Sequence, residues 1–248
     1  PTSYPAMRPR LSLPIIFLSL CGAFAARADV SLPRIFGSHM VIQCDAPVPI
    51  WGTADPGEAI VVVAGDLPAI NAEAGSDGRW KVTLPAMAAG GPIKISIKGR
   101  NEIVLDDVLI GEVWLCSGQS NMEWTVGGSA NPEQEVPAAN WPKIRHFKVE
   151  KRPEGYPVRD VPSTKQWEIC SPQTVAAFTA CGYFMARHLH KELGVPVGLI
   201  NSSWGGTRIE PWTPPAGFEM VPELVEFVKK IRLADPKSAD YKAALGAY

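Results

Sequence analysis

The stretch VLIGEVWLCSGQSNMEW, residues 108–124, joins a near-continuous apolar run to an abrupt turn of small polar residues. The apolar run ends at Cys116 and is broken by Glu112, which suits a strand buried on both faces, as in a parallel sheet. A helix is expected to begin at Ser120 or Asn121. The Ser120 hydroxyl is therefore predicted to lie just beyond the carboxyl end of a parallel strand, where open α/β sheets place their ligands.

Strand and helix patterns alternate from here towards the C-terminus. Further strands are expected over 144–149 and 197–201, and helices over 174–193 and 223–233. This order is typical of an α/β domain with a parallel sheet, here residues 109–248. About three strands would leave open edges and a poor core, so we expect the domain to be incomplete and the sequence to be truncated at both ends.

The residues before this domain predict a small antiparallel β-sandwich over 29–108. Short segments rich in β-branched residues alternate there with turns that contain glycine, proline and aspartate. The expected strands are 41–42, 48–51, 59–63, 80–84 and 93–97. Such closely spaced strands without helical periodicity are typical of a sandwich.

The first 28 residues have the pattern of a signal peptide. Two arginines precede an apolar run over 11–24, and Ala-Arg-Ala at 26–28 fits a small-x-small cleavage site. The run is shorter than the ~20 residues that a membrane span needs, so no membrane anchor is expected. A lipid anchor on Cys21 is the alternative, which the bulky residue before it disfavours. We expect export, to the periplasm or medium, of a mature chain beginning at Asp29.

Charge and cysteine content exclude several classes of partner. A formal net charge of -1 without basic runs gives no electrostatic reason to expect nucleic acid or an anionic membrane. The cysteines of the mature chain have no metal-ligand spacing, and no metal is expected. Buried free thiols are favoured over disulfides for Cys44, Cys116, Cys170 and Cys181.

Two motifs carry the chemistry. A serine at a strand-to-helix turn is, by itself, more often a helix cap than a nucleophile, and Met122 stands where the nucleophile elbow of α/β-hydrolases needs glycine. The second motif, PVGLINSSWGGTRIEPW at 196–212, has another buried strand that ends in a turn with Gly205 and Gly206. Backbone N–H groups exposed by glycine can form an oxyanion hole, although such glycines, taken alone, are more often part of a plain turn.

Taken together, residues 111–124 and 198–207 closely resemble the sialate O-acetylesterase family of SGNH-type hydrolases. FGSHMVIQ at 36–43 and SDGRW at 76–80 are similar to the leading β-domain of that family. The resemblance implies a flavodoxin-like three-layer α/β/α domain and a serine esterase that acts on O-acetylated sialic acids or related glycans. The mechanism that this resemblance implies needs no cofactor.

The resemblance also assigns roles. Ser120 matches the nucleophile, and its N–H would be one oxyanion donor; Gly205 or Gly206 matches the oxyanion glycine. The family's later asparagine motif and its Asp-x-x-His motif do not occur here. His39, His146, His188 and His190 are expected to be surface or packing residues. We therefore expect the catalytic histidine beyond residue 248, and the fragment itself to be inactive.

Residues that flank the two motifs are candidates for substrate contact, since aromatic rings can stack on sugars and arginine suits a carboxylate. The candidates are Gln119, Asn121, Trp124, Arg208 and Glu210. Core packing, a salt bridge or helix capping are the alternatives. An acetyl-xylan esterase on the same scaffold and a non-catalytic carbohydrate-binding module remain open as functions, as does the oligomeric state.

Overall fold

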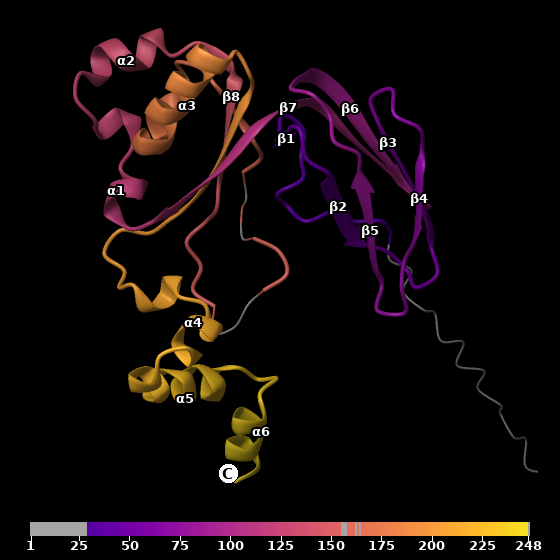
Figure 1. The fold of residues 1–248 in the computed structure, drawn as a ribbon, viewed down its shortest axis with the longest axis vertical. Coiled ribbons are helices and arrows are strands. Elements are labelled where there is room, and N and C mark those ends of the chain that lie inside the picture. Colours follow the sequence, from indigo (N-terminus) through magenta and orange to yellow (C-terminus); the bar gives the residue numbers. More distant parts are fainter. Residues whose placement is uncertain (1–28, 155–157, 162, 164, 248) are drawn as a thin grey trace, which may run out of the picture.

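A long strand, β7 (Glu102–Gly118), runs through both parts of the molecule (Figure 1). The computed structural model describes residues 29–154, 158–161, 163 and 165–247, so the predicted signal peptide lies outside the described residues. The first half of β7 pairs antiparallel with β6 (Gly90–Lys98), and its second half pairs parallel with β10 (Val197–Ser203). The boundary predicted at residue 108 thus falls inside one continuous strand.

The N-terminal part consists of two layers of strands that share one core. Within the described residues, eight strands form a mixed sheet in the order β4-β3-β6-β7-β10-β8-β9, with β1 beside β7, and β2 and β5 form a second sheet. Side chains from both layers, such as Ile50 and Leu84 on one and Ile60 and Ile97 on the other, pack in a single cluster. The strands not yet bounded are β1 (Val41–Gln43), β2 (Val48–Thr53), β3 (Ala59–Ala64), β4 (Ile70–Glu73) and β5 (Arg79–Leu84).

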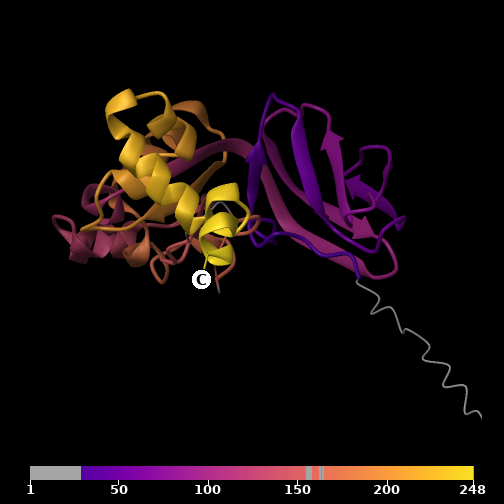
Figure 2. The same cartoon turned by 90° about the horizontal axis from the view of Figure 1, so that it is seen from below.

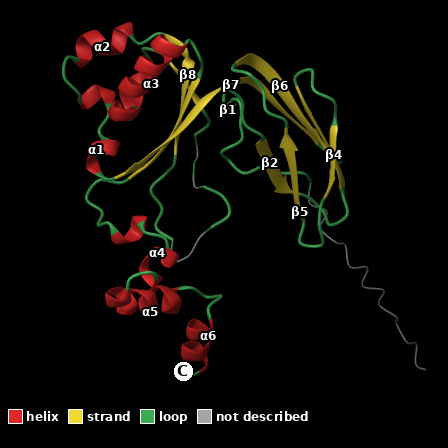
Figure 3. Cartoon of the chain, viewed as in Figure 1, coloured by secondary structure: helices red, strands yellow, loops and turns green. Residues whose placement is uncertain are grey.

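The C-terminal part is the α/β unit that positions the site. β8 (Trp141–Lys148) pairs parallel with β10, and the short β9 (Glu168–Cys170) pairs antiparallel with β8. Helix α3 (Ala180–Leu193) packs against this sheet with Tyr183 and Ala186 fully buried. The predicted parallel strands are therefore present, in the order β7-β10-β8. The described helices all follow β7 in the chain, and Figure 3 shows them outside the β-rich N-terminal part.

The helix predicted from residue 174 begins later than expected. Val175–Ala177 forms a 3-10 turn, and α3 starts only at Ala180. The intervening backbone is used to hold the segment after Ser120, because Val126 N–H donates to Phe178 O and Ala180 N–H donates to Trp124 O. These hydrogen bonds are incompatible with a continuous helix from 174.

The prediction that the strand over 108–116 is buried on both faces is wrong at its C-terminal end. Trp114 is 41% exposed and Leu115 is 68% exposed. Residues 112–118 pair with β10 on one side, and no strand of the described residues pairs with their other edge. Trp114 and Leu115 are exposed because this end of β7 lies at an edge of the described sheet, although its sequence is apolar.

Helices α4 to α6 lie away from the sheet core, whereas α1 and α2 contribute Met122 and Val136 to the cluster of the α/β unit. Figure 2 shows α4 to α6 as a group beside the α/β unit, where Phe218 stacks on Phe227 at 5.7 Å between ring centroids. The helix predicted over 223–233 corresponds to α5. The bounds are α1 (Ser120–Glu123), α2 (Pro132–Ala138), α4 (Pro215–Glu219), α5 (Val225–Ala234) and α6 (Ala239–Gly246). No described helix is long and apolar enough to cross a membrane.

Candidate active site around Ser120

The two sequence motifs meet because β7 and β10 end at the same level. Ser203 stands opposite Gly118 in the parallel register, and Trp204 N–H donates to Gly118 O at 2.9 Å. Gly118 has a φ of 137°, a conformation that residues with a Cβ rarely adopt, and it turns the chain sharply after the strand. Ser120 and Gly205, each two residues beyond this last pair, are thereby brought together.

Ser120 is the first residue of α1 and is exposed. Gln119 precedes the helix, and its carbonyl accepts hydrogen bonds from the N–H groups of Met122 and Glu123. The Ser120 N–H makes no hydrogen bond to any residue that the structure describes. This N–H therefore remains available to a ligand oxygen, and the hydroxyl beside it is accessible.

The structure distinguishes the two glycines of the second motif. A Cβ placed on Gly205 would lie 3.2 Å from Ser120 Oγ and 2.7 Å from Glu123 Oε2, whereas a Cβ on Gly206 would meet nothing within 4 Å. Gly206 instead takes a φ of 79° that turns the backbone. Gly205 is the glycine that contacts Ser120, and its missing side chain makes this contact possible.

Glu123 currently occupies the Gly205 N–H. This N–H donates to Glu123 Oε2 at 2.5 Å, and the carboxylate also forms an ion pair with Lys151. The hydrogen bond from Lys151 is the main cause that holds the pKa of Glu123 below its ordinary value, and the Gly205 N–H acts in the same direction. A carboxylate oxygen thus sits where a negative oxygen is stabilised beside Ser120.

A polar network beneath the turn was not anticipated from the sequence. Lys148 Nζ donates to Asn201 Oδ1 and, at 3.2 Å, to Ser203 Oγ. Asn201 Nδ2 donates to the carbonyls of Cys116 at 3.1 Å and Met122 at 3.4 Å, which ties β10 to both sides of the Ser120 turn. Burial lowers the pKa of Lys148. Lys148 lies at the carboxyl end of β8, and Asn201 and Ser203 lie at the carboxyl end of β10. This position at the end of a parallel strand is the sequence signal that could have identified them.

Two cavities adjoin the turn. The first, about 320 Å³, is lined by Ser120, Glu123, Trp124, Thr125, Gly128 and Gly205. Trp124 is 59% exposed, and its Nε1–H donates to Gly128 O at 2.8 Å, which fixes the ring at the rim. The second cavity, about 500 Å³, borders the turn that contains Gly205, and its lining includes Lys151, Ser203, Trp204, Thr207 and Trp212.

Of the predicted substrate-contact residues, Trp124 alone lines one of these two cavities; Gln119, Asn121, Arg208 and Glu210 line neither. Asn121 accepts a hydrogen bond at its backbone carbonyl from Cys181 Sγ at 3.3 Å, and Arg208 is exposed. Glu210 Oε2 is buried with no hydrogen-bond partner among the described residues. Substrate contact by the four residues outside the cavities stays a prediction.

None of the histidines lines either cavity. His39 lies 2.7 Å from Asp107 Oδ2, and His190 Nδ1 lies 2.7 Å from Val195 O. His146 is buried and stacks on Phe178 at 4.3 Å, and burial lowers its pKa to about 3. The described residues therefore place no imidazole beside Ser120.

The cysteines are free thiols, and the described residues form no metal site. Cys44, Cys116 and Cys170 are buried free thiols, as expected, whereas Cys181 is free but exposed. Among the described residues, no group of three or more histidine, cysteine, aspartate or glutamate side chains could hold a metal ion.

Comparisons with known proteins agree on one family. The model of the carbohydrate esterase family described as sialic acid-specific acetylesterase matches residues 110–245. Sialate O-acetylesterases from Homo sapiens and Pongo abelii are each 31% identical over 194 residues, which cover 71% of this chain and 37% of theirs. The chain thus spans well under half the length of these curated relatives.

The crystal structure of a carbohydrate acetylesterase from Xanthomonas citri is also similar, with 39% identity and a TM-score of 0.74 over 79% of this chain and 45% of that one. This likeness confirms the predicted α/β fold of the SGNH type. The family match covers more than half of the sequence and includes the Ser120 turn and the Gly205 turn. The chain belongs to the carbohydrate esterase family of sialic acid-specific acetylesterases.

Proposed function

We propose that Ser120 is the nucleophile of an esterase that removes O-acetyl groups from sugars, with O-acetylated sialic acids as the first substrate class. The observation that carries the proposal is the contact between the Ser120 turn and the Gly205 turn at the carboxyl ends of two adjacent parallel strands. It places an accessible hydroxyl beside two backbone N–H groups. The relatives, which are named for this activity, support the same reaction.

The reaction proceeds through an acyl-enzyme. Ser120 Oγ attacks the acetyl carbonyl carbon, its proton passes to a general base, and the carbonyl oxygen becomes negative. The N–H groups of Ser120 and Gly205 bind this oxygen. Collapse of the intermediate breaks the ester bond and releases the sugar hydroxyl, which takes the proton from the base. Water then attacks the acyl-enzyme and releases acetate.

Glu123 has to yield its position for this to happen. Its carboxylate accepts the Gly205 N–H in the structure, so the acetyl oxygen competes with it for the same donor. The ion pair with Lys151 gives the displaced carboxylate a partner that it keeps while substrate is bound. The cavity of about 320 Å³ beside Ser120 accommodates the acetyl group, and Trp124 at its rim faces the sugar.

The general base comes from outside the residues that surround Ser120. The four histidines of the chain lie elsewhere, and no other described group lining the cavity combines a free lone pair with a pKa near neutrality. We therefore propose that the base is a histidine other than these four. The fraction of the relatives' length that the chain spans supports this assignment.

The test compares Ser120→Ala with Ser117→Ala in protein expressed from the complete reading frame. Ser117 is exposed near the end of β7, three positions before Ser120, and does not line the cavity, so it is a matched control. Acetate release from O-acetyl sialic acid should fall about 10³-fold or more in Ser120→Ala and stay unchanged in Ser117→Ala. Equal activity of the two variants would refute the assignment. Activity on acetylated xylan but not on sialic acid esters would replace the substrate class.

Export is a separate part of the proposal. The arginines, apolar run and Ala-Arg-Ala pattern of residues 8–28 support removal of these residues and action outside the cytoplasm. N-terminal sequencing of the protein recovered from its native host should find Asp29 as the first residue. Recovery of a chain that retains residues 8–28 would contradict it.

A further inference from the structure

A hollow of about 650 Å³ lies against the N-terminal part of the chain, and Arg159 and Asp160 from the segment 158–161 also line it; none of its lining residues belongs to the Ser120 site. It is larger than either cavity beside Ser120, and it falls within the range of about 300–1,000 Å³ that is usual for small-ligand sites. Its lining includes Leu32, Trp51, Thr53, Glu73, Arg79 and Lys81. A hollow of this size, outside the site already described, has room for a small ligand.

The floor of the hollow is the outer face of the β2–β5 pair. Side chains on β2 and β5 alternate between buried and exposed, so Ile50 and Trp80 enter the core while their neighbours face outwards. The antiparallel register places Trp51 opposite Lys81 and Thr53 opposite Arg79. Residues paired in this way lie side by side on one face, which puts an aromatic ring next to two cations.

Trp51 is held in place yet open to solvent. Its ring packs edge to face against Phe36 with 4.6 Å between centroids, and 38% of the residue remains exposed. A fixed, exposed indole is the kind of surface on which the apolar face of a pyranose ring stacks, because both are flat and half apolar. Beside it, the hydroxyls of Ser31 and Thr53 lie 2.7 Å apart and can bond to sugar hydroxyls.

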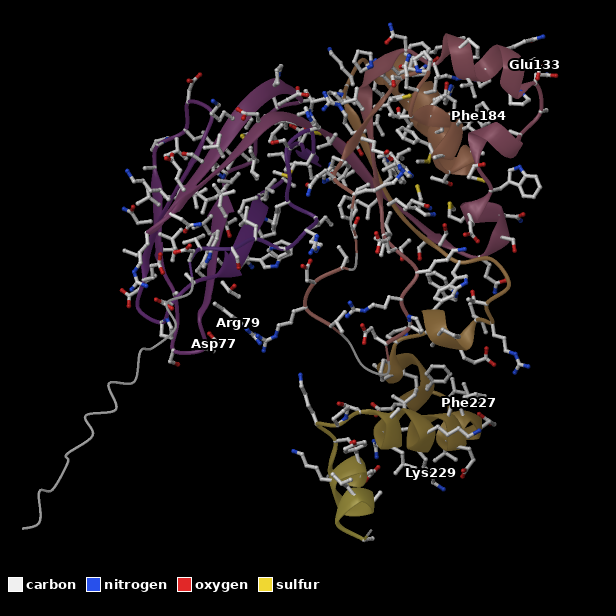
Figure 4. The ribbon with its side chains drawn as sticks, turned by 180° about the vertical axis from the view of Figure 1, so that it is seen from behind. Asp77, Arg79, Glu133, Phe184, Phe227 and Lys229 are labelled. Atoms are coloured by element: carbon white, nitrogen blue, oxygen red, sulfur yellow. The ribbon has the colours of Figure 1, made fainter. Side chains whose placement is uncertain are left out.

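The charged residues that line the hollow are three cations, Arg79, Lys81 and Arg159, and two carboxylates, Glu73 and Asp160, and the two cations beside the Trp51 ring favour a carboxylate there. Lys81 forms no ion pair with a residue that the structure describes. Arg79 pairs with Asp77 at 3.1 Å, but both side chains are about half exposed, and such pairs contribute little and are readily exchanged. Figure 4 shows Asp77 and Arg79 together at the end of the β-rich part, on its side towards the helices. Glu73, from β4, lines the same hollow and can accept from sugar hydroxyls.

We propose that this face is a second carbohydrate site, which binds an acidic glycan with a pyranose ring on Trp51 and a carboxylate at Lys81 and Arg79. The site holds the glycan without cleaving it, and it does not depend on Ser120. The β-rich part then acts as a binding module that is joined to the esterase unit by β7.

Binding is measured by affinity gel electrophoresis of the full chain in gels that contain polysialic acid, polygalacturonate or, as the neutral comparison, unacetylated xylan. These probes carry no acetyl ester to cleave at Ser120. The wild-type chain should be retarded by both acidic glycans and much less by xylan. Trp51→Ala should weaken the retardation at least tenfold, and Lys81→Met severalfold for the acidic glycans. Trp114→Ala is the matched control, because Trp114 is also about 40% exposed but lies on β7 outside the hollow.

Trp51→Phe retains the aromatic contact with Phe36 and should keep most of the binding, which separates a lost stacking surface from a damaged fold. Retardation of Trp51→Ala equal to wild type, or an equal loss in Trp114→Ala, would overturn the site. Equal retardation by xylan that Lys81→Met leaves unchanged would overturn the preference for acid. Hydrolysis of a small aryl acetate by the complete protein should be the same in Trp51→Ala and wild type, so this result is independent of the proposed esterase.

Discussion

Replacing Gly205 with alanine tests the assignment of the oxyanion donor. The added methyl group would lie 2.7 Å from Glu123 Oε2, 3.2 Å from Ser120 Oγ and 3.4 Å from Ser120 Cα. The first contact can be relieved by moving the carboxylate of Glu123. The contact with Ser120 Oγ is tighter than ordinary, and relieving it separates the reacting hydroxyl from the Gly205 N–H, either by rotation of the serine side chain or by movement of the two turns, whereas the contact with Ser120 Cα is close to an ordinary van der Waals distance.

The expected loss follows from what that separation removes. Loss of one oxyanion donor typically reduces the rate about 10²–10³-fold, equivalent to about 3–4 kcal/mol of barrier. We expect Gly205→Ala to lower kcat by this amount. Gly206→Ala meets no atom within 4 Å and strains only its own backbone, at a φ of 79°. It should lower stability by about 1–2 kcal/mol and leave kcat within a few-fold of wild type.

The assay is hydrolysis of an aryl acetate by protein from the complete reading frame, with thermal unfolding of each variant as the fold control. A larger loss of kcat in Gly206→Ala than in Gly205→Ala would show that the wrong glycine has been assigned. Wild-type kcat in Gly205→Ala would show that neither the donor nor the contact with Ser120 matters for catalysis.

Three further predictions concern stability. Burial lowers the pKa of His146 to about 3 from 6.5, so between these values the unfolded chain binds a proton that the folded chain does not, and stability falls as the pH drops, by about 1.4 kcal/mol per unit. His146→Leu should remove this slope in urea unfolding between pH 7 and pH 5; an unchanged slope would contradict it. Lys148→Met removes the lysine donor from Ser203 Oγ and leaves the Ser203 hydroxyl as the donor to Asn201 Oδ1, so it should cost about 1–3 kcal/mol in the same assay; unchanged stability would contradict this role of the lysine. Gly182→Ala puts a methyl group 2.8 Å from Cys116 Sγ and should cost about 1–3 kcal/mol, whereas Gly246→Ala, with no atom within 4 Å, should change stability little; equal melting of the two would refute the packing argument.

The local sequence pattern predicted where individual strands lie better than it predicted which strands pair with one another. The alternation of apolar and polar residues in 80–84 and the apolar run at 197–201 identified β5 and β10. A strand that is buried on one or both faces has a recognisable order of apolar residues, so its own sequence is enough to detect it. The same run in β7 gave no sign that Trp114 and Leu115 face solvent, because exposure there depends on a neighbouring strand and not on the strand itself. β4 was missed because its four residues bury none of their side chains fully.

The site was partly predictable for a related reason. The rule that parallel strands end at one edge of a sheet predicts that the Ser120 turn and the turn with Gly205 and Gly206 meet, but the roles of these residues came from the family resemblance, and the choice of Gly205 over Gly206 needed the structure. Glu123, Lys148 and Asn201 act through hydrogen bonds across β7, β8 and β10, and the order of those strands is a tertiary property. The expectation for Arg208 rested on its chemical type, and the structure leaves it exposed and outside the lining of both cavities beside Ser120.

The continuity of β7 has a consequence for how the protein opens. Amides in the first half of this strand bond to β6 and amides in the second half bond to β10, yet both halves are one uninterrupted backbone. Opening either core frays the ladder on which the other depends, so slow hydrogen exchange in 103–110 and in 113–117 should report one shared opening free energy. A substitution in the N-terminal core, at Leu105 for example, would then reduce the population of molecules in which the Ser120 turn is formed.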